Sequence, residues 1–164
     1  MPVQLTYEVE GPIGVDGQKI EAYPSAIATG VAEAAAVPVG KVVVYDTGAG
    51  RTLKAVMQPS TTAQVTTLVG VAGLAMWDPT YPEPPYPVGQ ALPVMRKGRM
   101  AIQPETPLTV HTNPFVRFGL VGAGTVLGAL RNDADAGNAV AAPYLTVVKG
   151  STGAGDLAIV EIDL

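Results

Sequence analysis

Apolar and polar residues alternate strictly at the start of the chain. The apolar positions are Val3, Leu5, Tyr7 and Val9, and the polar positions between them are Gln4, Thr6, Glu8 and Glu10. A two-residue period predicts a β-strand with one buried face. Glycine and proline then break the pattern between residues 11 and 17, so we assign residues 1–24 to an extended N-terminal arm. This strand either opens the core sheet or is given to a neighbouring chain.

Short apolar runs bounded by turn residues recur along the remaining chain. They predict strands at Thr52–Met57, Thr66–Ala75, Met95–Gln103, Leu108–His111, Val116–Leu120, Thr146–Lys149 and Leu157–Leu164. Glycines that precede apolar runs within 37–44, 86–94 and 120–127 are typical of turns or bulges that lead into strands. Many short strands with almost no helix predict an all-β fold. We expect one domain over residues 25–164, a small β-barrel or jelly-roll-like sandwich.

Two segments predict something other than a strand. The alanine-rich run Ala32–Ala36 favours helix intrinsically, but Gly30 interrupts it and Pro38 stops it. It therefore predicts a short helix or turn at most. The basic run Arg96–Arg99 predicts a solvated hairpin turn, with contact to an anion or an acidic partner as the alternative.

Composition narrows the function. With 19 Gly, 15 Pro and 48% hydrophobic residues among 164, the chain folds around a core and is rich in turns. Its formal net charge of −4 disfavours nucleic-acid binding, which needs clustered Lys and Arg. The sequence has neither a signal-peptide pattern nor an apolar run long enough to span a membrane, so we expect a soluble protein made in the cytoplasm without membrane contact.

Three motifs have a catalytic or ligand-binding interpretation, and a structural one is favoured for each. Residues 150–156 resemble a phosphate-binding loop, but no helix is predicted after them, so a hairpin turn is preferred. Residues 132–138 resemble half of a calcium loop without its closing Glu, which favours a polar surface loop. The single histidine, His111, lacks a supporting nucleophile motif, and there are no cysteines. We therefore predict no catalytic residue, no cofactor, no metal and no enzymatic activity.

A proline- and aromatic-rich strap covers residues 77–87. Five of its residues are prolines, which cannot continue a helix. The aromatic rings in it either pack over their own domain or dock on a partner. Taken with the arm, the predicted partner-binding residues are Val3, Leu5, Tyr7, Trp77, Tyr81 and Tyr86.

Several weak elements in a fixed order resemble the cement, or decoration, proteins of tailed-bacteriophage capsids. They are the arm Met1–Tyr23, Val37–Asp46, Leu68–Ala72, Tyr86–Val94 and Val121–Val126. The resemblance implies a β-barrel or jelly-roll-like core on the outer capsid surface of the virion. It further implies that the chain contacts the major capsid protein, bridges neighbouring capsid subunits and stabilises the mature head.

Other classes stay open at this point. As a homo-oligomer the chain is expected to have closed symmetry, as a homodimer or a homotrimer. A tail or head–tail connector subunit is a second structural interpretation. A carbohydrate-binding β-sandwich is a third, because Trp and Tyr rings stack on sugars, and a small hydrolase has the least support.

Overall fold

The computed structural model describes residues 14–20, 24–66, 71–76, 78, 85–153 and 155–164. Ten strands, one short α-helix and one 3₁₀ turn are found in this part of the chain. In order they are β1 (Ala26–Ala32), β2 (Val42–Tyr45), β3 (Ala55–Met57), α1 (Thr62–Thr66), β4 (Val71–Ala75), β5 (Ala91–Ile102), β6 (Phe115–Arg117), β7 (Leu130–Arg131), η1 (Asp135–Gly137), β8 (Ala139–Ala141), β9 (Leu145–Lys149) and β10 (Ala158–Asp163). The predicted all-β class is confirmed.

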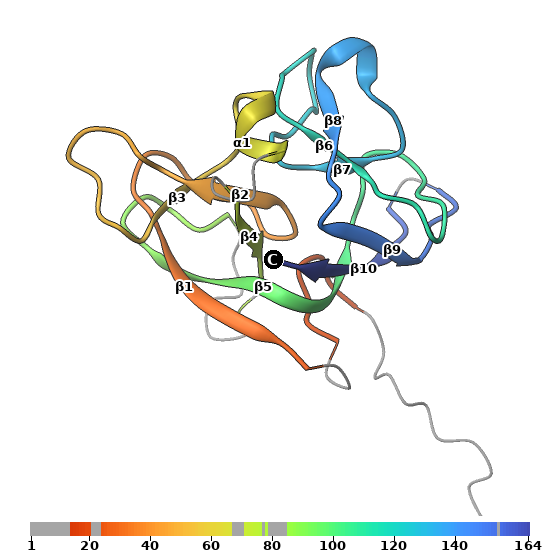
Figure 1. The fold of residues 1–164 in the computed structure, drawn as a ribbon, viewed down its shortest axis with the longest axis horizontal. Coiled ribbons are helices and arrows are strands. Elements are labelled where there is room, and N and C mark those ends of the chain that lie inside the picture. The colour runs from red at the N-terminus through yellow and green to blue at the C-terminus, as the bar shows by residue number, and fades with distance from the viewer. Residues whose placement is uncertain (1–13, 21–23, 67–70, 77, 79–84, 154) are drawn as a thin grey trace, which may run out of the picture.

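The strands form two sheets (Figure 1). The larger has the order β1-β3-β2-β4-β5-β10-β9, and the smaller has the order β7-β6-β8. An additional β1–β5 pairing connects five strands of the larger sheet in a closed cycle, while β10 and β9 continue beyond it. The fold is therefore sandwich-like and not a clear barrel, so only the sandwich form of the prediction holds.

Alternate residues of the central strands point into two different cores. One core lies within the five-strand cycle and contains Val43, Val56 and Val94. The other lies between the larger sheet, the smaller sheet and α1, and contains Val42, Leu74 and further residues of β5, β9 and β10. Both faces of the sheet are thus buried near β2 and β4, which explains their nearly continuous apolar sequences.

Strand β5 contributes to both cores, and its register against β1 changes once along its length. Between Ala26 and Ile27 of β1, the pairing with β5 shifts from Lys97 to Met95 and skips Arg96. One extra residue reverses which side chains face a given side. As a result Met95 and Met100 both enter the same core, although they lie an odd number of residues apart.

Residues 17–20 pair with the edge of β5, where Lys19 and Met100 form an isolated antiparallel bridge. The backbone N–H of Gly17 donates to Ala101 O and that of Ile20 donates to Arg99 O. Ile20 packs with Ala101 and Ile159 in a small third cluster. This part of the assigned arm therefore lies on its own domain, whereas residues 1–13 lie outside the described residues.

Two local predictions are wrong, and a third holds only in its turn alternative. The alanine-rich run Ala32–Ala36 forms no helix: Ala32 ends β1, which pairs with β3 and β5, and residues 33–36 form a loop with bends at Ala34 and Ala35. The basic run Arg96–Arg99 lies inside β5 and not in a hairpin turn; Arg99 and Lys97 instead form ion pairs with β10. Residues Leu108–His111 form no strand, although Leu108 O accepts a hydrogen bond from Ser151 N.

Other predictions hold. The strands β9 and β10 lie at the predicted positions, and the segment between them connects an antiparallel pair as a hairpin turn does. His111 lies in an exposed turn. None of the described helices has the length and apolar character that crossing a bilayer requires.

Buried tyrosines predict an alkaline weakening of the fold. Burial, and then the charge of Asp78, raises the pKa of Tyr86 from 10.0 to about 12, and burial raises the pKa of Tyr144. When folding raises the pKa of a phenol, the group contributes its full stabilisation at pH values below its pKa in the unfolded chain. This contribution is lost as pH rises towards its pKa in the folded protein. We expect the free energy of unfolding, measured by urea titration, to fall as pH rises from 10.0 towards about 12.

Two phenylalanine variants test this expectation. The Tyr86 hydroxyl donates to Met76 O at 2.9 Å, so Tyr86→Phe should cost about 1 kcal/mol at pH 8 and reduce the alkaline loss. The Tyr144 hydroxyl is buried with no hydrogen-bond partner among the described residues, so Tyr144→Phe should cost little at pH 8. An alkaline loss unchanged in both variants would contradict the assignment.

Candidate functional site

Three loops meet at one end of the domain, at the left in Figure 1. We call residues 33–36, 47–54 and 87–90 the loop end. Hydrogen bonds connect them: Arg51 Nη1 donates to Glu33 O at 3.1 Å, and Gly89 N donates to Ala32 O at 2.6 Å. The Thr52 hydroxyl and N–H both donate to the Glu33 carboxylate. The loops therefore hold one another in place.

The loop end presents apolar side chains to solvent. Leu53 is 98% exposed and Val88 is 59% exposed, and Ala34, Ala35 and Ala36 are exposed beside them. A surface pocket of about 450 Å³ lies next to Leu53 and is lined by residues 45–48 and 51–53. Such a cluster of exposed apolar residues on projecting loops is typical of a contact surface.

Charges at the loop end are largely paired within the chain. The Arg51 guanidinium lies 3.0 Å from Asp46, whose side chain is nearly buried. The Glu33 carboxylate accepts the Thr52 bonds described above. Lys54, next to Leu53, is also exposed, so the outward surface of the loop end combines apolar side chains with charged ones.

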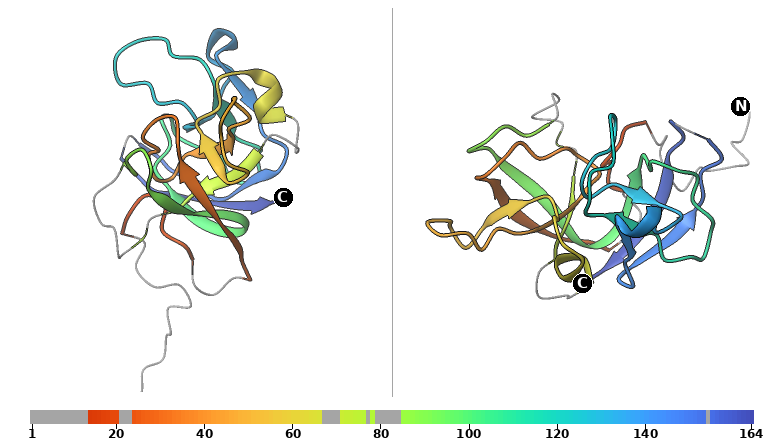
Figure 2. Two further views of the ribbon diagram at one scale, coloured as in Figure 1. Left: turned by 90° about the vertical axis from the view of Figure 1, so that its left-hand side faces the viewer. Right: turned by 90° about the horizontal axis from the view of Figure 1, so that it is seen from above.

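A second projection is the loop between β6 and β7, residues 118–129, drawn in teal at the top of Figure 1 and extending sideways in Figure 2. Leu120 is 64% exposed and Val121 is 55% exposed. No charged residue occurs from Gly119 to Val126. This loop is thus a second exposed apolar tip, separate from the loop end, and it is uncharged from Gly119 to Val126.

An ion-pair network holds the base of the β6–β7 loop. Arg117, whose side chain is only 2% exposed, lies 2.8 Å from Glu105 and 2.7 Å from Asp135. Arg131 pairs with the same two carboxylates at 3.4 and 3.0 Å and with Asp133 at 2.6 Å. Desolvation lowers the pKa of Arg117, but bonds to Glu105 and Asp135 outweigh it and raise that pKa overall. Arg117 therefore stays charged.

The same network fixes the loop backbone. Glu105 accepts a hydrogen bond from Val126 N at 3.1 Å, and Arg117 Nη1 donates to Gly119 O at 3.0 Å. Gln58 Nε2 donates to Leu127 O at 2.7 Å. The polar residues 132–138, which resemble half of a calcium loop, thus supply carboxylates to arginines. Among the described residues no cluster of metal-binding side chains occurs.

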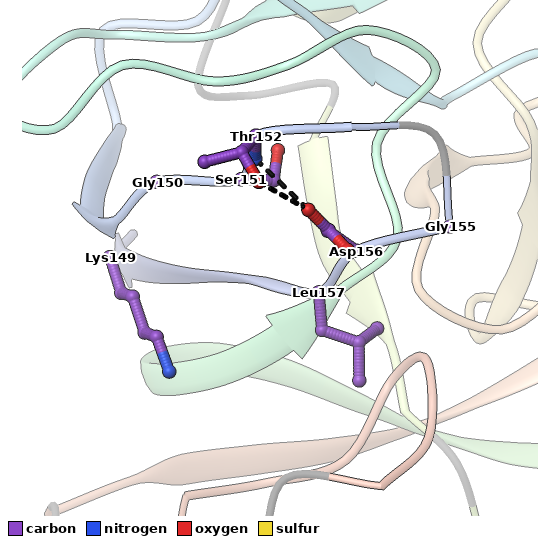
Figure 3. A pocket seen from close by; sticks show the side chains of 7 residues that line it. All are labelled: Lys149, Gly150, Ser151, Thr152, Gly155, Asp156 and Leu157. Carbon is purple, nitrogen blue, oxygen red and sulfur yellow. Dashed lines mark hydrogen bonds between the residues drawn. The ribbon is translucent and has the colours of Figure 1, made fainter.

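The β9–β10 turn borders a pocket of about 490 Å³, shown in Figure 3. Asp156 accepts hydrogen bonds from Thr152 Oγ1 at 2.7 Å and Thr152 N at 3.2 Å, and these bonds lower the pKa of Asp156. The Asp156 carboxylate therefore already accepts the hydrogen bond of the Thr152 N–H group, which a phosphate-binding loop would donate to the phosphate. This supports the turn interpretation of residues 150–156.

The predicted partner-binding residues fall in different places. Val3, Leu5, Tyr7, Trp77 and Tyr81 lie outside the described residues. Tyr86 is only 1% exposed and packs with Val37 and Leu92, as expected for the alternative in which the strap packs over its own domain. Sequence reasoning missed Leu53, Val88, Leu120 and Val121. In the sequence, each of these is an apolar residue close to turn-forming residues. This pattern is common in loops and therefore does not single them out.

The fold and these surfaces define an all-β structural or binding domain. A family model described as "Structural cement protein (E217 gp24/Pam3 gp6)" matches residues 3–163, so the chain belongs to this family of phage structural cement proteins. It is a virion structural protein that associates with the phage capsid and stabilises it.

A solved structure shares the fold. A chain of "The capsid of Myoviridae Phage XM1" superposes with a TM-score of 0.65 at 16% identity, covering 98% of this chain and 94% of that one. At this identity the likeness establishes the architecture alone. No curated protein gives a match.

Proposed function

We propose that this chain binds the outer surface of the assembled phage head and bridges neighbouring major capsid subunits, without catalytic activity. The family match over residues 3–163 carries this proposal. A ligand that binds the assembled shell and not the separated subunits stabilises the shell by mass action. Because a head offers many equivalent sites, a modest stabilisation by each bound copy adds up over the whole shell.

Particle composition tests the proposal. Virions are fractionated by density, and mass spectrometry measures the ratio of this chain to the major capsid protein. We expect a fixed ratio of one copy per capsid subunit or a simple fraction of it. A few copies per particle would indicate a tail or connector subunit instead, and recovery in the light soluble fraction would overturn the proposal.

We further propose that the chain acts as a homodimer or homotrimer, because closed symmetry is the general rule for homo-oligomers and a shell offers two-fold and three-fold axes. β1 supports this: β3 pairs with it only at Val31 and Ala32, so Ala26–Gly30 have no strand neighbour on that side among the described residues. The molar mass in solution by light scattering tests it, and a monomer at all concentrations would exclude it.

The arm gives a direct prediction. Deleting residues 1–10 should weaken attachment to heads at least about tenfold, because an added strand supplies backbone hydrogen bonds to a sheet edge. We expect the melting temperature to stay unchanged, because the arm is proposed to bind the capsid and the core is expected to stay folded without it. Attachment is measured by co-sedimentation with heads prepared without the chain.

A full-length variant distinguishes the effect of the apolar pattern of the arm from the effect of its length. Replacing Val3, Leu5 and Tyr7 by threonine keeps the arm but removes its apolar face, and it should weaken attachment to a similar degree. Unchanged attachment after the deletion would refute a binding role for the arm.

A further inference from the structure

We propose that two copies of this chain join through the outer edge of β1, which pairs with β1 of a second copy in antiparallel orientation around a two-fold axis at Ala28. The larger sheet then continues from one copy into the next. This inference rests on the proposed self-association, and it names the contact and the register that produce it.

Successive residues of β1 direct their backbone groups to opposite sides. Ala32 N donates to Gln90 O at 3.0 Å, next to β5, whereas Val31 N donates to Lys54 O at 2.9 Å, next to β3. In an antiparallel pair, this direction alternates from one residue to the next. After the register shift of β1, even-numbered residues therefore face β5, and odd-numbered residues face away from it.

Two residues of β1 have outward backbone groups and no strand beside them. Ile27 and Thr29 have the same orientation as Val31, and Thr29 lies opposite Pro93, which has no N–H group to exchange. β3 pairs with β1 only at Val31 and Ala32. Among the described residues, the N–H and C=O groups of Ile27 and Thr29 therefore have no hydrogen-bond partner.

β1 lacks the protection that the other end of the larger sheet has. At β9, His111 N donates to Val147 O at 2.8 Å, and Val147 N donates to Thr112 O at 3.0 Å, so a loop covers that edge. An uncovered edge is a template for another strand, and proteins commonly block it with charged residues or proline. Residues 25–32 contain neither a proline nor a charged side chain. The outer edge of β1 is therefore open to pairing.

This edge is complementary to a second copy of itself in one register. With a two-fold axis at Ala28, Ile27 of each copy lies opposite Thr29 of its partner, and these residues exchange N–H···O bonds in both directions. An axis at Thr29 would place Ile27 opposite Val31, whose N–H already has a partner. An axis at Ile27 would place Thr29 opposite Ser25, which lies beyond the register shift of β1.

The side chains of β1 suit the same pairing. Ile27 is 50% exposed and Thr29 is exposed, and both are β-branched, which favours packing across strands. Ala28, at the axis, is small enough for the two strands to approach closely. Because residues 25–32 carry no charge, two copies bring no like charges together. These properties favour a second copy over a partner that is recognised through charge.

Disulfide crosslinking tests the register, because the chain has no cysteine of its own. In this pairing the Cα atoms of the two Ala28 residues lie about 4.5 Å apart, within the range of a disulfide. The Cα atoms of the two Ile27 residues lie roughly 8 Å apart, which is too far. Full-length Ala28→Cys, with Ile27→Cys as the matched control, is oxidised with diamide, both free and bound to heads. We expect Ala28→Cys to give at least about tenfold more covalent dimer on non-reducing gels.

Charge variants test the same register without a crosslink. Ile27→Lys with Thr29→Glu places opposite charges across the pairing, whereas Ile27→Lys with Thr29→Lys places like charges there. Both positions are exposed, so both variants should fold. We expect the wild type and the opposite-charge variant to form the dimer and the like-charge variant to be a monomer, in light scattering over a range of concentrations.

Several results would overturn the inference: equal crosslinking of Ile27→Cys and Ala28→Cys, no crosslinking of either, or a like-charge variant with the molar mass of the wild type. A like-charge variant that loses attachment to heads while the wild type is a monomer would overturn it too, because a capsid strand would then occupy this edge. The proposed function is tested separately, by co-sedimentation of the wild type with heads prepared without the chain. If the wild type attaches but Ala28→Cys does not crosslink, the inference alone fails; if the wild type does not attach, the proposed function fails.

Discussion

Replacing Arg117 by methionine is expected to destabilise the domain by about 3 kcal/mol, because breaking a buried ion pair leaves its partners uncompensated. Arg117 lies 2.8 Å from Glu105 and 2.7 Å from Asp135. Without it, three carboxylates remain around Arg131 alone, and like charges repel. Urea unfolding at neutral pH measures the change in free energy.

An exposed ion pair of equal length provides the control. Lys97 lies 2.8 Å from Asp163, with both side chains more than half exposed. Exposed ion pairs contribute little, because water screens the charges and two long side chains must be held in one geometry, so Lys97→Met should change stability little. Equal losses in Arg117→Met and Lys97→Met would show that burial of the network does not matter.

The arginine variant also loosens the β6–β7 loop. Arg117 donates to Gly119 O at the start of this loop, and its partner Glu105 accepts from Val126 N near the end. We therefore expect faster amide exchange at Val126 in Arg117→Met. The network thus connects the stability of the core to the position of the second tip.

Strand patterns were the most predictable part of the fold. β9 and β10 follow directly from apolar runs next to a glycine-rich turn, and continuous burial in β10 is consistent with its weak alternation. β1 was not predictable from local sequence, because alanine and glycine become strand residues there only through pairing with β3 and β5. Local propensity decides little where tertiary pairing is available.

The candidate site was less predictable, for a different reason. Arg117 and Glu105 are 12 residues apart, and no sequence pattern indicates that the fold buries them together. Charged runs are usually solvated, so Arg96–Arg99 suggested a turn, although Arg99 pairs with Glu161 on the neighbouring strand. Tyr86 shows the same limitation: an aromatic residue beside prolines suits an interface, but only the fold reveals its burial.

Gly73→Ala is expected to cost about 4 kcal/mol, because backbone strain and a steric clash add at this position. Gly73 lies in β4 at φ +138°, where the β2–β4 register shifts. A Cβ there would lie 2.2 Å from Met95 O and 2.9 Å from Val94 Cγ1. The backbone oxygen cannot move without breaking the contact between β4 and β5.

Gly122→Ala is the matched control for this substitution. Gly122 has nearly the same φ, +140°, but a Cβ there would meet no atom within 4 Å. The strain is therefore shared by both variants, and Gly122→Ala should cost only about 1–2 kcal/mol. Thermal and urea unfolding of the two variants measure the difference, which isolates the clash with β5. If Gly73→Ala were no worse than Gly122→Ala, β4 and β5 could not approach each other as closely as Gly73 implies. That result would contradict the close packing of β4 against β5 at Gly73.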